Sequence, residues 1–407
     1  MFVILPLFFD GIKKYPPIFS CQKERDVVVS VQVYCSLQLH ISIREGITMT
    51  QLTQIRKEES LKLAVMTAPL IKDLMTTPKI MRTVMYSLLP ICAFSIYLFG
   101  ISALVLILTT IISCVATEQW CNTKLGKGVT VTDGSAIVTG ILLALTLPPG
   151  YPLWMACFGG AFAIAAGKIC FGGLGKNIFN PALVGRVFIH ISWPQAITTW
   201  VPPFALHRFT EFIPSTFTGI LCKPIPITDW LTTIQVDGFT GATPLTLFKF
   251  QQIASDPLAM ATGFTSGSTG ETCAILILLC GLYLWWKLRH YGYDGNIPLS
   301  MLAGAAITGG IFYWLNAEIY PDPLFILTSG GLLFGAVFMA TDPVGAPITP
   351  LGRIIFGVFI GFLVVMIRIF GAFPEGVMFA ILCGNAVMPI INRLIQPRPF
   401  GVGRGAK

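Results

Sequence analysis

The chain has 407 residues, of which 54% are hydrophobic and 11% charged, and its formal net charge is +8. Soluble domains carry about 25% charged residues. Residues 1–82 hold 18 of the 46 charged side chains, so the other 325 residues hold only 28. This composition excludes a water-soluble globular or disordered chain and indicates several membrane spans.

The basic charge and the cysteines indicate neither nucleic-acid binding nor a metal centre. Beyond residue 82 the basic side chains lie mostly in loops between apolar runs, as positive-inside topology produces. The eleven cysteines form no CxxC pair and no Cys/His cluster with metal spacing. Most lie inside apolar runs, where cysteine packs as a small hydrophobic residue. We therefore expect no nucleic acid and no iron–sulphur cluster on this chain.

Residues 1–78 are expected to form a cytoplasmic N-terminal segment. Its first 48 residues mix charged and β-branched side chains without a clear span. Met49 offers a second start, and codons for Arg44-Glu45-Gly46 before it are compatible with a bacterial ribosome-binding site. We therefore expect residues 1–48 to be an upstream-start artefact.

Ten apolar segments follow, several of them near the ~20 residues that span a bilayer. Glycine and proline separate them, as Pro148-Pro149 does. The segments cover about 81–99, 101–121, 134–148, 152–169, 181–194, 271–286, 297–315, 324–341, 354–371 and 376–392. The fold class predicted is an all-α polytopic membrane protein with about ten transmembrane helices.

Loop charges indicate the orientation of these spans. If the amino terminus is cytoplasmic, the inner loops are basic and the outer loops are mainly acidic. Only Arg368, near the outer end of its span, departs from this pattern. The inner basic residues are Lys124, Lys127, Lys168, Lys176, Lys287, Arg289, Arg353, Arg393, Arg398, Arg404 and Lys407. Both termini are therefore expected in the cytoplasm.

One long outer loop, 195–270, separates five spans from five. Loops longer than about 12–15 residues are usually functional or disordered. The membrane halves, 79–194 and 271–394, would cross in opposite orientations, as inverted repeats of transporter-like folds do. This five-plus-five layout is similar to that of urea channels. A cytoplasmic tail is expected at 395–407.

The strongest motif lies in the outer loop and runs from Asp237 to Leu245, Asp-Gly-Phe-Thr-Gly-Ala-Thr-Pro-Leu. Taken alone, it is a glycine-rich turn before proline. It resembles the D-G-x-[ST]-G-A-T segment of the D subunit of Rnf complexes and the B subunit of the sodium-pumping quinone reductase. In that family the last threonine is esterified to the phosphate of FMN. The resemblance implies covalent FMN on Thr243, with Thr240, Gly241 and Ala242 beside it.

A second motif runs from Phe171 to Leu183, Phe-Gly-Gly-Leu-Gly-Lys-Asn-Ile-Phe-Asn-Pro-Ala-Leu. No strand precedes it, so a Rossmann phosphate loop is excluded, and a broken or re-entrant helix is expected after it. The stretch resembles the family's F-G-G-x-G-x-N-x-x-N-P-A motif, near which relatives hold a non-covalent riboflavin. Asn177 and Asn180 are therefore candidates to bind a second flavin. The alternative is that they cap the backbone of the broken helix.

Two aspartates, Asp133 and Asp342, lie at the inner ends of the third and eighth spans. Carboxylates at membrane depth are costly and often functional, and the resemblance implies a cation path at these positions. The alternative for Asp133 is a helix cap. Relatives often carry aspartate where this chain has Asn392, which weakens any transfer of the ion's identity.

The resemblance runs from about Lys79 to Gly401. Only Phe99-Gly100 separates the first two spans, which favours the Rnf branch because the quinone-reductase proteins carry a long insertion there. It implies a subunit that carries electrons between ferredoxin and NAD, coupled to Na⁺ or H⁺ translocation, in a bacterial inner membrane. It also implies partners: the A and E membrane subunits, the flavoprotein G subunit, the cytoplasmic B and C subunits, and a flavin transferase.

Two alternatives remain at this point. One is the B subunit of the quinone reductase, and the other is a passive small-solute channel. A channel has no use for a flavinylated threonine, so Thr243 separates these functions.

Overall fold

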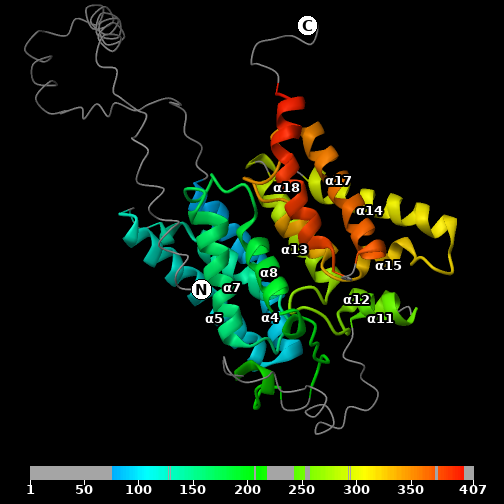
Figure 1. Ribbon diagram of the computed structural model, residues 1–407, viewed down its shortest axis with the longest axis horizontal. Coiled ribbons are helices and arrows are strands. Elements are labelled where there is room, and N and C mark those ends of the chain that lie inside the picture. The colour runs from blue at the N-terminus through cyan, green and yellow to red at the C-terminus, as the bar shows by residue number, and fades with distance from the viewer. Residues whose placement is uncertain are drawn as a thin grey trace, which may run out of the picture. The chain divides into compact units, whose positions relative to one another are not determined.

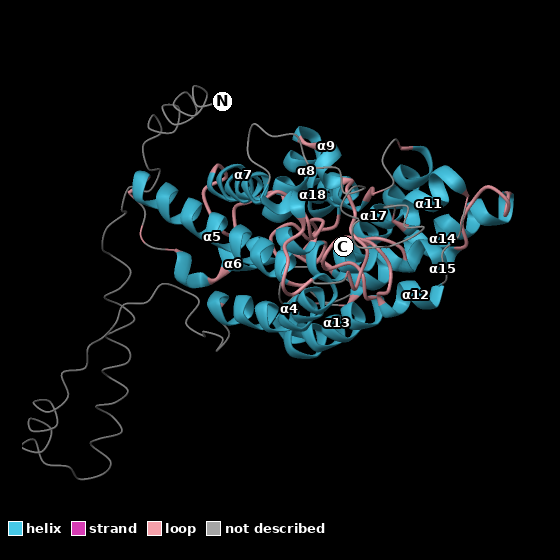
Figure 2. Cartoon of the chain, turned by 90° about the horizontal axis from the view of Figure 1, so that it is seen from below, coloured by secondary structure: helices cyan, strands magenta, loops and turns pink. Residues whose placement is uncertain are grey.

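The structure, a computed structural model, describes residues 76–126, 128, 130–205, 208–217, 243–252, 257–291, 293, 295–371 and 375–397. None of these residues lies in a strand (Figure 2). The expectations for residues 1–75, including the start at Met49, lie outside the described residues, as do Thr240, Gly241 and Ala242.

Helices of the first half form one group and those of the second half a neighbouring group (Figure 1). The first half contains α4 Thr77–Phe99, α5 Ile101–Lys124, α6 Ser135–Leu145, α7 Leu153–Ile164, α8 Pro181–Ser192 and α9 Pro194–Ile197. The segment that connects the two halves contains α11 Pro244–Gln251 and α12 Pro257–Thr262. The second half contains α13 Ala274–Leu288, α14 Asn296–Leu315, α15 Pro323–Thr328, α16 Leu332–Phe334, α17 Pro350–Phe370 and α18 Val377–Leu394.

Five of these helices, α4, α5, α14, α17 and α18, are long and apolar enough to cross a membrane. At 1.5 Å per residue a helix of 20 residues is about 30 Å long, which is the thickness of the hydrocarbon layer. Four shorter apolar stretches correspond to α6, α7 with the turn after it, α8 and α13. The chain is therefore a helical membrane protein.

Each apolar segment expected from the sequence contains at least one helix, but the segment at 324–341 is not continuous. It consists of α15, a break at Ser329–Gly331, α16 and a π-helical turn at Gly335–Met339. Gly330 has φ +61°, a conformation that glycine adopts without strain. A second π turn, Ala165–Ile169, ends the α7 segment. Such turns often occur at functional sites.

Glycine allows the closest helix contact. In α17, a Cβ on Gly357 would overlap the Ser300 side chain of α14, and one on Gly361 would overlap the carbonyl of Met301. Small residues at such crossings let two backbones approach closely in a membrane, where packing drives association. The α14–α17 contact therefore depends on these two glycines.

The main hydrophobic core is continuous across both halves of the described chain. It includes Leu145 and Leu183 of the first half and Phe334, Phe356 and Ile381 of the second. The halves meet where α4 packs against α13 and α8 packs against α18. These contacts position the ends of α8, α17 and α18 beside the connecting segment that carries Thr243.

Candidate functional site

Thr243 occupies the N-cap of α11. Its Oγ1 accepts a hydrogen bond from the backbone N–H of Thr246 at 3.3 Å and lies 2.9 Å from Thr246 Oγ1. Pro244 fills the first helical position, where no backbone donor is needed. The hydroxyl therefore lies at the positive end of a helix, where anions are stabilised. Sequence reasoning expected a turn here but did not predict the helix.

A hollow lies beside Thr243, between the connecting segment and the ends of the long helices. Two carboxylates, Glu271 and Glu375, line it together with Thr243. The remaining lining residues are Pro244, Leu245, Met260, Thr265, Ser266, Gly267, Thr272, Thr328, Ser329 and Gly330. Thr243 itself is only 6% exposed.

A second hollow lies next to the first and is lined by two arginines and two glutamates. Arg186 of α8 pairs with Glu375 and lies with Nη1 3.9 Å from Glu271 Oε1. Arg368 of α17 lines the same hollow. We call Arg186, Glu271, Arg368 and Glu375 the charge cluster. Glu271 lies before α13 begins, and burial raises the pKa of its carboxyl to about 7, although Arg186 opposes the shift.

The sixth apolar segment predicted from the sequence begins at Glu271. In the structure this residue precedes α13 and its carboxylate faces Arg186. Sequence reasoning did not single out Arg186. Its position inside a short apolar segment was the available signal, since a buried arginine in a membrane needs an acidic partner.

Arg368 also stabilises the break between α15 and α16. Its Nη1 donates to the carbonyl of Ile326 at 2.7 Å, and its Nη2 donates to that of Ser329 at 3.0 Å. Carbonyls at a helix end have no partner within the helix, and leaving them unsatisfied in an apolar layer costs several kcal/mol. Arg368, which departs from the loop-charge pattern expected from the sequence, is therefore buried and donates hydrogen bonds to backbone carbonyls.

A wider hollow lies on the other side of Leu245. Aromatic rings line it from α11, the α14–α15 turn, α15 and α17: Phe248, Tyr320, Phe325 and Phe370. Arg368 lines both this aromatic hollow and the one at the charge cluster. Lys249 of α11 holds the end of α17 by donating to the carbonyls of Arg368, at 3.1 Å, and Gly371. The site therefore joins aromatic and charged surfaces.

The asparagine motif lies at the start of α8. Asn180 is its N-cap, because its Oδ1 accepts from the N–H of Ala182 at 3.0 Å while its Nδ2 donates to the carbonyl of Met339 at 3.2 Å. Asn177 donates to the carbonyl of Phe179 at 3.1 Å. Its Oδ1 is buried without a hydrogen-bond partner in the described part of the chain. Asn180 thus caps the helix, and Asn177 keeps an open acceptor.

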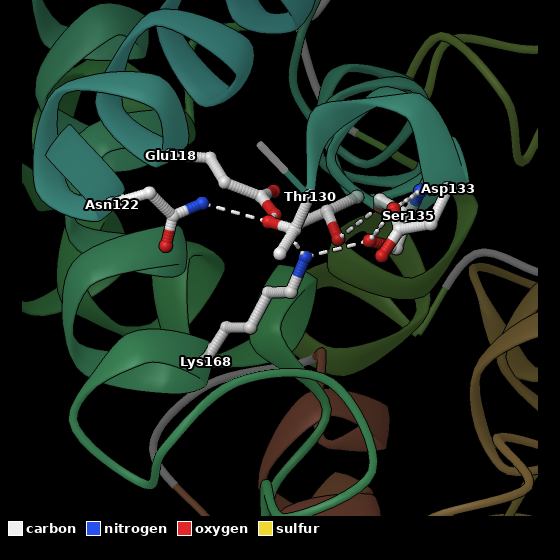
Figure 3. A network of polar contacts seen from close by, with 7 residues as sticks. Glu118, Asn122, Thr130, Asp133, Ser135 and Lys168 are labelled. Atoms are coloured by element: carbon white, nitrogen blue, oxygen red, sulfur yellow. Dashed lines mark hydrogen bonds and ion pairs between the residues drawn. The ribbon is translucent and has the colours of Figure 1, made fainter. Parts of the chain in front are cut away.

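Asp133 belongs to a buried polar network around Lys168 (Figure 3). Its Oδ1 accepts from the N–H and the hydroxyl of Ser135 at 2.8 and 2.6 Å. Lys168, in the π turn Ala165–Ile169, donates to Ser135 Oγ at 2.6 Å and to Glu118 Oε1 at 2.7 Å. Thr130 also donates to Glu118 Oε1, at 2.6 Å. Lys168 is therefore buried and ion-paired, whereas sequence reasoning treated it as a loop charge.

Asp342 lies in the turn after the π turn Gly335–Met339. Its Oδ1 accepts from the N–H of Val344 at 3.4 Å, and burial raises the pKa of its carboxyl to about 6. Its side chain is not among the ion pairs of the described residues. This carboxylate is thus less constrained than that of Asp133.

Known proteins similar to this chain cover most of its length. A family model described as "NQR2, RnfD, RnfE family" matches residues 64–401. The D subunit of the "Ion-translocating oxidoreductase complex" of Stutzerimonas stutzeri is 41% identical over 79% of this chain and 92% of its own length. The D subunit of the "Proton-translocating ferredoxin:NAD(+) oxidoreductase complex" of Clostridium ljungdahlii is 39% identical over 80% of this chain and 92% of its own length. The D subunit of the "Na(+)-translocating ferredoxin:NAD(+) oxidoreductase complex" of Acetobacterium woodii is 38% identical over 84% of this chain and 96% of its own length.

Proposed function

Because the chain belongs to the NQR2, RnfD, RnfE family, we propose that it is the D subunit of an Rnf-type complex. This complex couples electron transfer between ferredoxin and NAD to Na⁺ or H⁺ translocation, as the names of two relatives state for those proteins. The observation that carries the proposal is the position of Thr243, whose hydroxyl caps α11 beside a hollow lined by charged residues.

Thr243 carries FMN in this proposal, joined by a phosphoester to Oγ1. The residues present fit that group: the first backbone N–H groups of α11 face a phosphate at the cap, and the helix dipole favours its negative charge. Thr240, Gly241 and Ala242 precede it in the sequence. The aromatic hollow beyond Leu245 offers apolar faces for a flat ring. Bound FMN would supply the redox chemistry, and the protein supplies position and electrostatics.

A second flavin, a non-covalent riboflavin, is proposed near Asn177. Asn180 already uses its Oδ1 as the cap of α8, so it is the weaker candidate for hydrogen bonds to a flavin. Asn177 Oδ1 can accept a hydrogen bond from the ring edge, because no other described group donates to it.

The membrane architecture proposed is about ten spans in two inverted repeats of five helices, which is a urea-channel-like layout. Repeated packing supports it: α5 packs on α6 and α7 as α14 packs on α15 and α17, and α7 packs on α8 as α17 packs on α18. The contacts α4–α13 and α8–α18 join equivalent helices of the two halves. Both termini lie in the cytoplasm, the membrane is the bacterial inner membrane, and 195–270 is the outer loop.

Cations follow a path past Asp342 and Asp133 in this proposal. Asp342 is the better candidate, because Asp133 is held by Ser135. A carboxyl whose pKa is raised to about 6 binds a cation at pH 7 and loses it as pH falls through 6. Replacing Asp342 by Asn should slow ion uptake at pH 7 while the flavin stays attached. Ion uptake by this variant should no longer decrease as the pH falls through 6. Unchanged uptake in vesicles would exclude this residue from the path.

The partners proposed are the A and E membrane subunits, the flavoprotein G subunit, the cytoplasmic B and C subunits, a flavin transferase and membrane lipid. Catalysis belongs to the assembled complex, and this chain carries electrons within it. A test compares membrane vesicles that contain the complex with Thr243→Ala, with Thr240→Ala as the matched control. Ferredoxin-driven NAD reduction and ion uptake should both fall to background in Thr243→Ala alone. Equal activity in both variants would contradict the proposal.

A further inference from the structure

Members of the charge cluster line both the hollow beside Thr243 and the aromatic hollow. Glu271 and Glu375 share one hollow with Thr243, and Arg368 shares the aromatic hollow with the residues that follow Thr243 in α11. All four charged side chains line a common hollow between them. A negative charge that appears near Thr243 therefore faces the carboxylates of Glu271 and Glu375, which the two arginines accompany in the charge cluster.

The cluster is neutral when both glutamates are ionised, since two arginines balance two carboxylates. Arg186 is shared between Glu375 and Glu271, whereas Arg368 directs its two Nη groups to backbone carbonyls. Two buried polar atoms, Arg186 Nη1 and Arg368 Nε, have no hydrogen-bond partner among the described residues. A phosphodiester on Thr243 would add one negative charge, and each electron that reaches a flavin there would add another.

Resting on the proposed function, we propose that Glu271 and Glu375 form a proton-accepting pair that responds to the redox state of the flavin on Thr243. When an electron from the ferredoxin side of the complex enters the flavin, one proton from the outer water adds to a carboxylate oxygen of the pair. One O–H bond forms, and the charge gained by the electron is cancelled. When the electron leaves, that O–H bond breaks and the proton returns to water.

The surroundings of the pair fit proton uptake. Burial favours the protonated form of the Glu271 carboxyl and raises its pKa to about 7, so the proton can exchange near neutral pH. Arg186 holds the two carboxylates at one site, where like charges disfavour double ionisation. The other groups that face the cluster are His190 of α8 and Lys249 of α11, which approaches the backbone of α17 beside Arg368.

Redox-difference infrared spectroscopy of the purified complex tests this proposal. Reduction of the flavin should produce the C=O stretch of a protonated carboxylic acid, which moves to lower frequency in heavy water and after ¹³C labelling of glutamate side chains. The band should be missing in Thr243→Ala. A flavinylated wild-type complex without such a band would overturn the inference and leave the proposed function standing, whereas a wild-type chain without flavin would defeat the proposed function itself.

Variants of the two glutamates test whether the proton binds to the charge cluster. Glu271→Gln or Glu375→Gln should remove or shift the band and weaken the pH dependence of the flavin midpoint potential. Glu318→Gln, at an exposed glutamate of the α14–α15 turn, should change neither. Retained fluorescence of each flavinylated chain in a denaturing gel shows that it has folded and been modified. A band that persists unchanged in both glutamate variants would show that the proton does not bind to Glu271 or Glu375. If one of the two variants does not accumulate in the membrane, the spectrum of the other variant decides the question.

Discussion

Several charged side chains inside the apolar segments are held by defined partners. Lys168 is the clearest case, because its ammonium is buried with Glu118 and Ser135 at the turn that ends the α7 segment (Figure 3). The loop-charge pattern places Lys168 among the basic residues expected in the inner loops, and nothing in the spacing of Glu118 and Lys168, 50 residues apart, predicted their contact. Pairing of distant residues follows from packing, which composition does not encode.

Breaking this pair should destabilise the protein strongly. Lys168→Met leaves the Glu118 carboxylate buried without its cation, which typically costs about 3–5 kcal/mol. The double variant Lys168→Met, Glu118→Gln removes the uncompensated charge and should recover part of that loss. Lys176→Met, at an exposed lysine of the next loop, should change the free energy of unfolding by less than about 0.5 kcal/mol. Unfolding in detergent measures all three, and equal stability of Lys168→Met and Lys176→Met would contradict the role of the pair.

At the scale of elements, helix positions follow the apolar runs, but the breaks within them have structural causes that hydropathy does not report. The segment 324–341 reads as one span, yet Ser329, Gly330 and Gly331 interrupt it. The break is stabilised by Arg368 from another helix. Similarly, the motif at Thr243 predicted a turn before proline but not helix α11, because the helix depends on packing of Leu245 against Met260 and Phe325.

Gly331 provides room for the charge cluster. A Cβ at this position would overlap the Glu271 carboxylate, although the backbone has φ −76° and can accept alanine. Gly331→Ala should therefore push the carboxylate away from Arg186 and destabilise the fold by about 1–3 kcal/mol. Gly310→Ala in α14 is the matched control, since its nearest neighbour would lie at 3.8 Å, and it should be neutral or slightly stabilising. If thermal unfolding in detergent shows the same change for both variants, the steric argument is wrong.

At the scale of the whole molecule, composition predicted a helical membrane protein, and the five long apolar helices confirm that class. The number of spans and their inverted arrangement remain proposals, because α6, α8 and α13 are shorter than a full span and their depth depends on the surrounding membrane. Family membership followed from motifs in the sequence. The charge cluster could not be predicted, since Arg186, Glu271 and the stretch from Arg368 to Glu375 lie far apart in the chain.

Orientation can be tested in intact cells with single cysteines in a background whose native cysteines do not react. Cysteines at Thr240 or Ser255, in the outer loop, should be labelled by a membrane-impermeant reagent. One at Gly126, next to Lys124 and Lys127, should be protected until the cells are opened, because basic loops stay inside. Reversed accessibility would place Thr243 on the cytoplasmic side and overturn the topology.

The most direct test of the central claim is whether flavin remains on this chain after denaturation. FMN joined through its phosphate keeps its ring free, so the band should fluoresce in a denaturing gel when a flavin transferase is co-expressed. Thr243→Ala should be dark because alanine offers no hydroxyl, Thr243→Ser should retain some label, and Thr240→Ala should retain most of it. A dark wild-type band, in a host shown to flavinylate a related protein, would contradict the electron-carrier function.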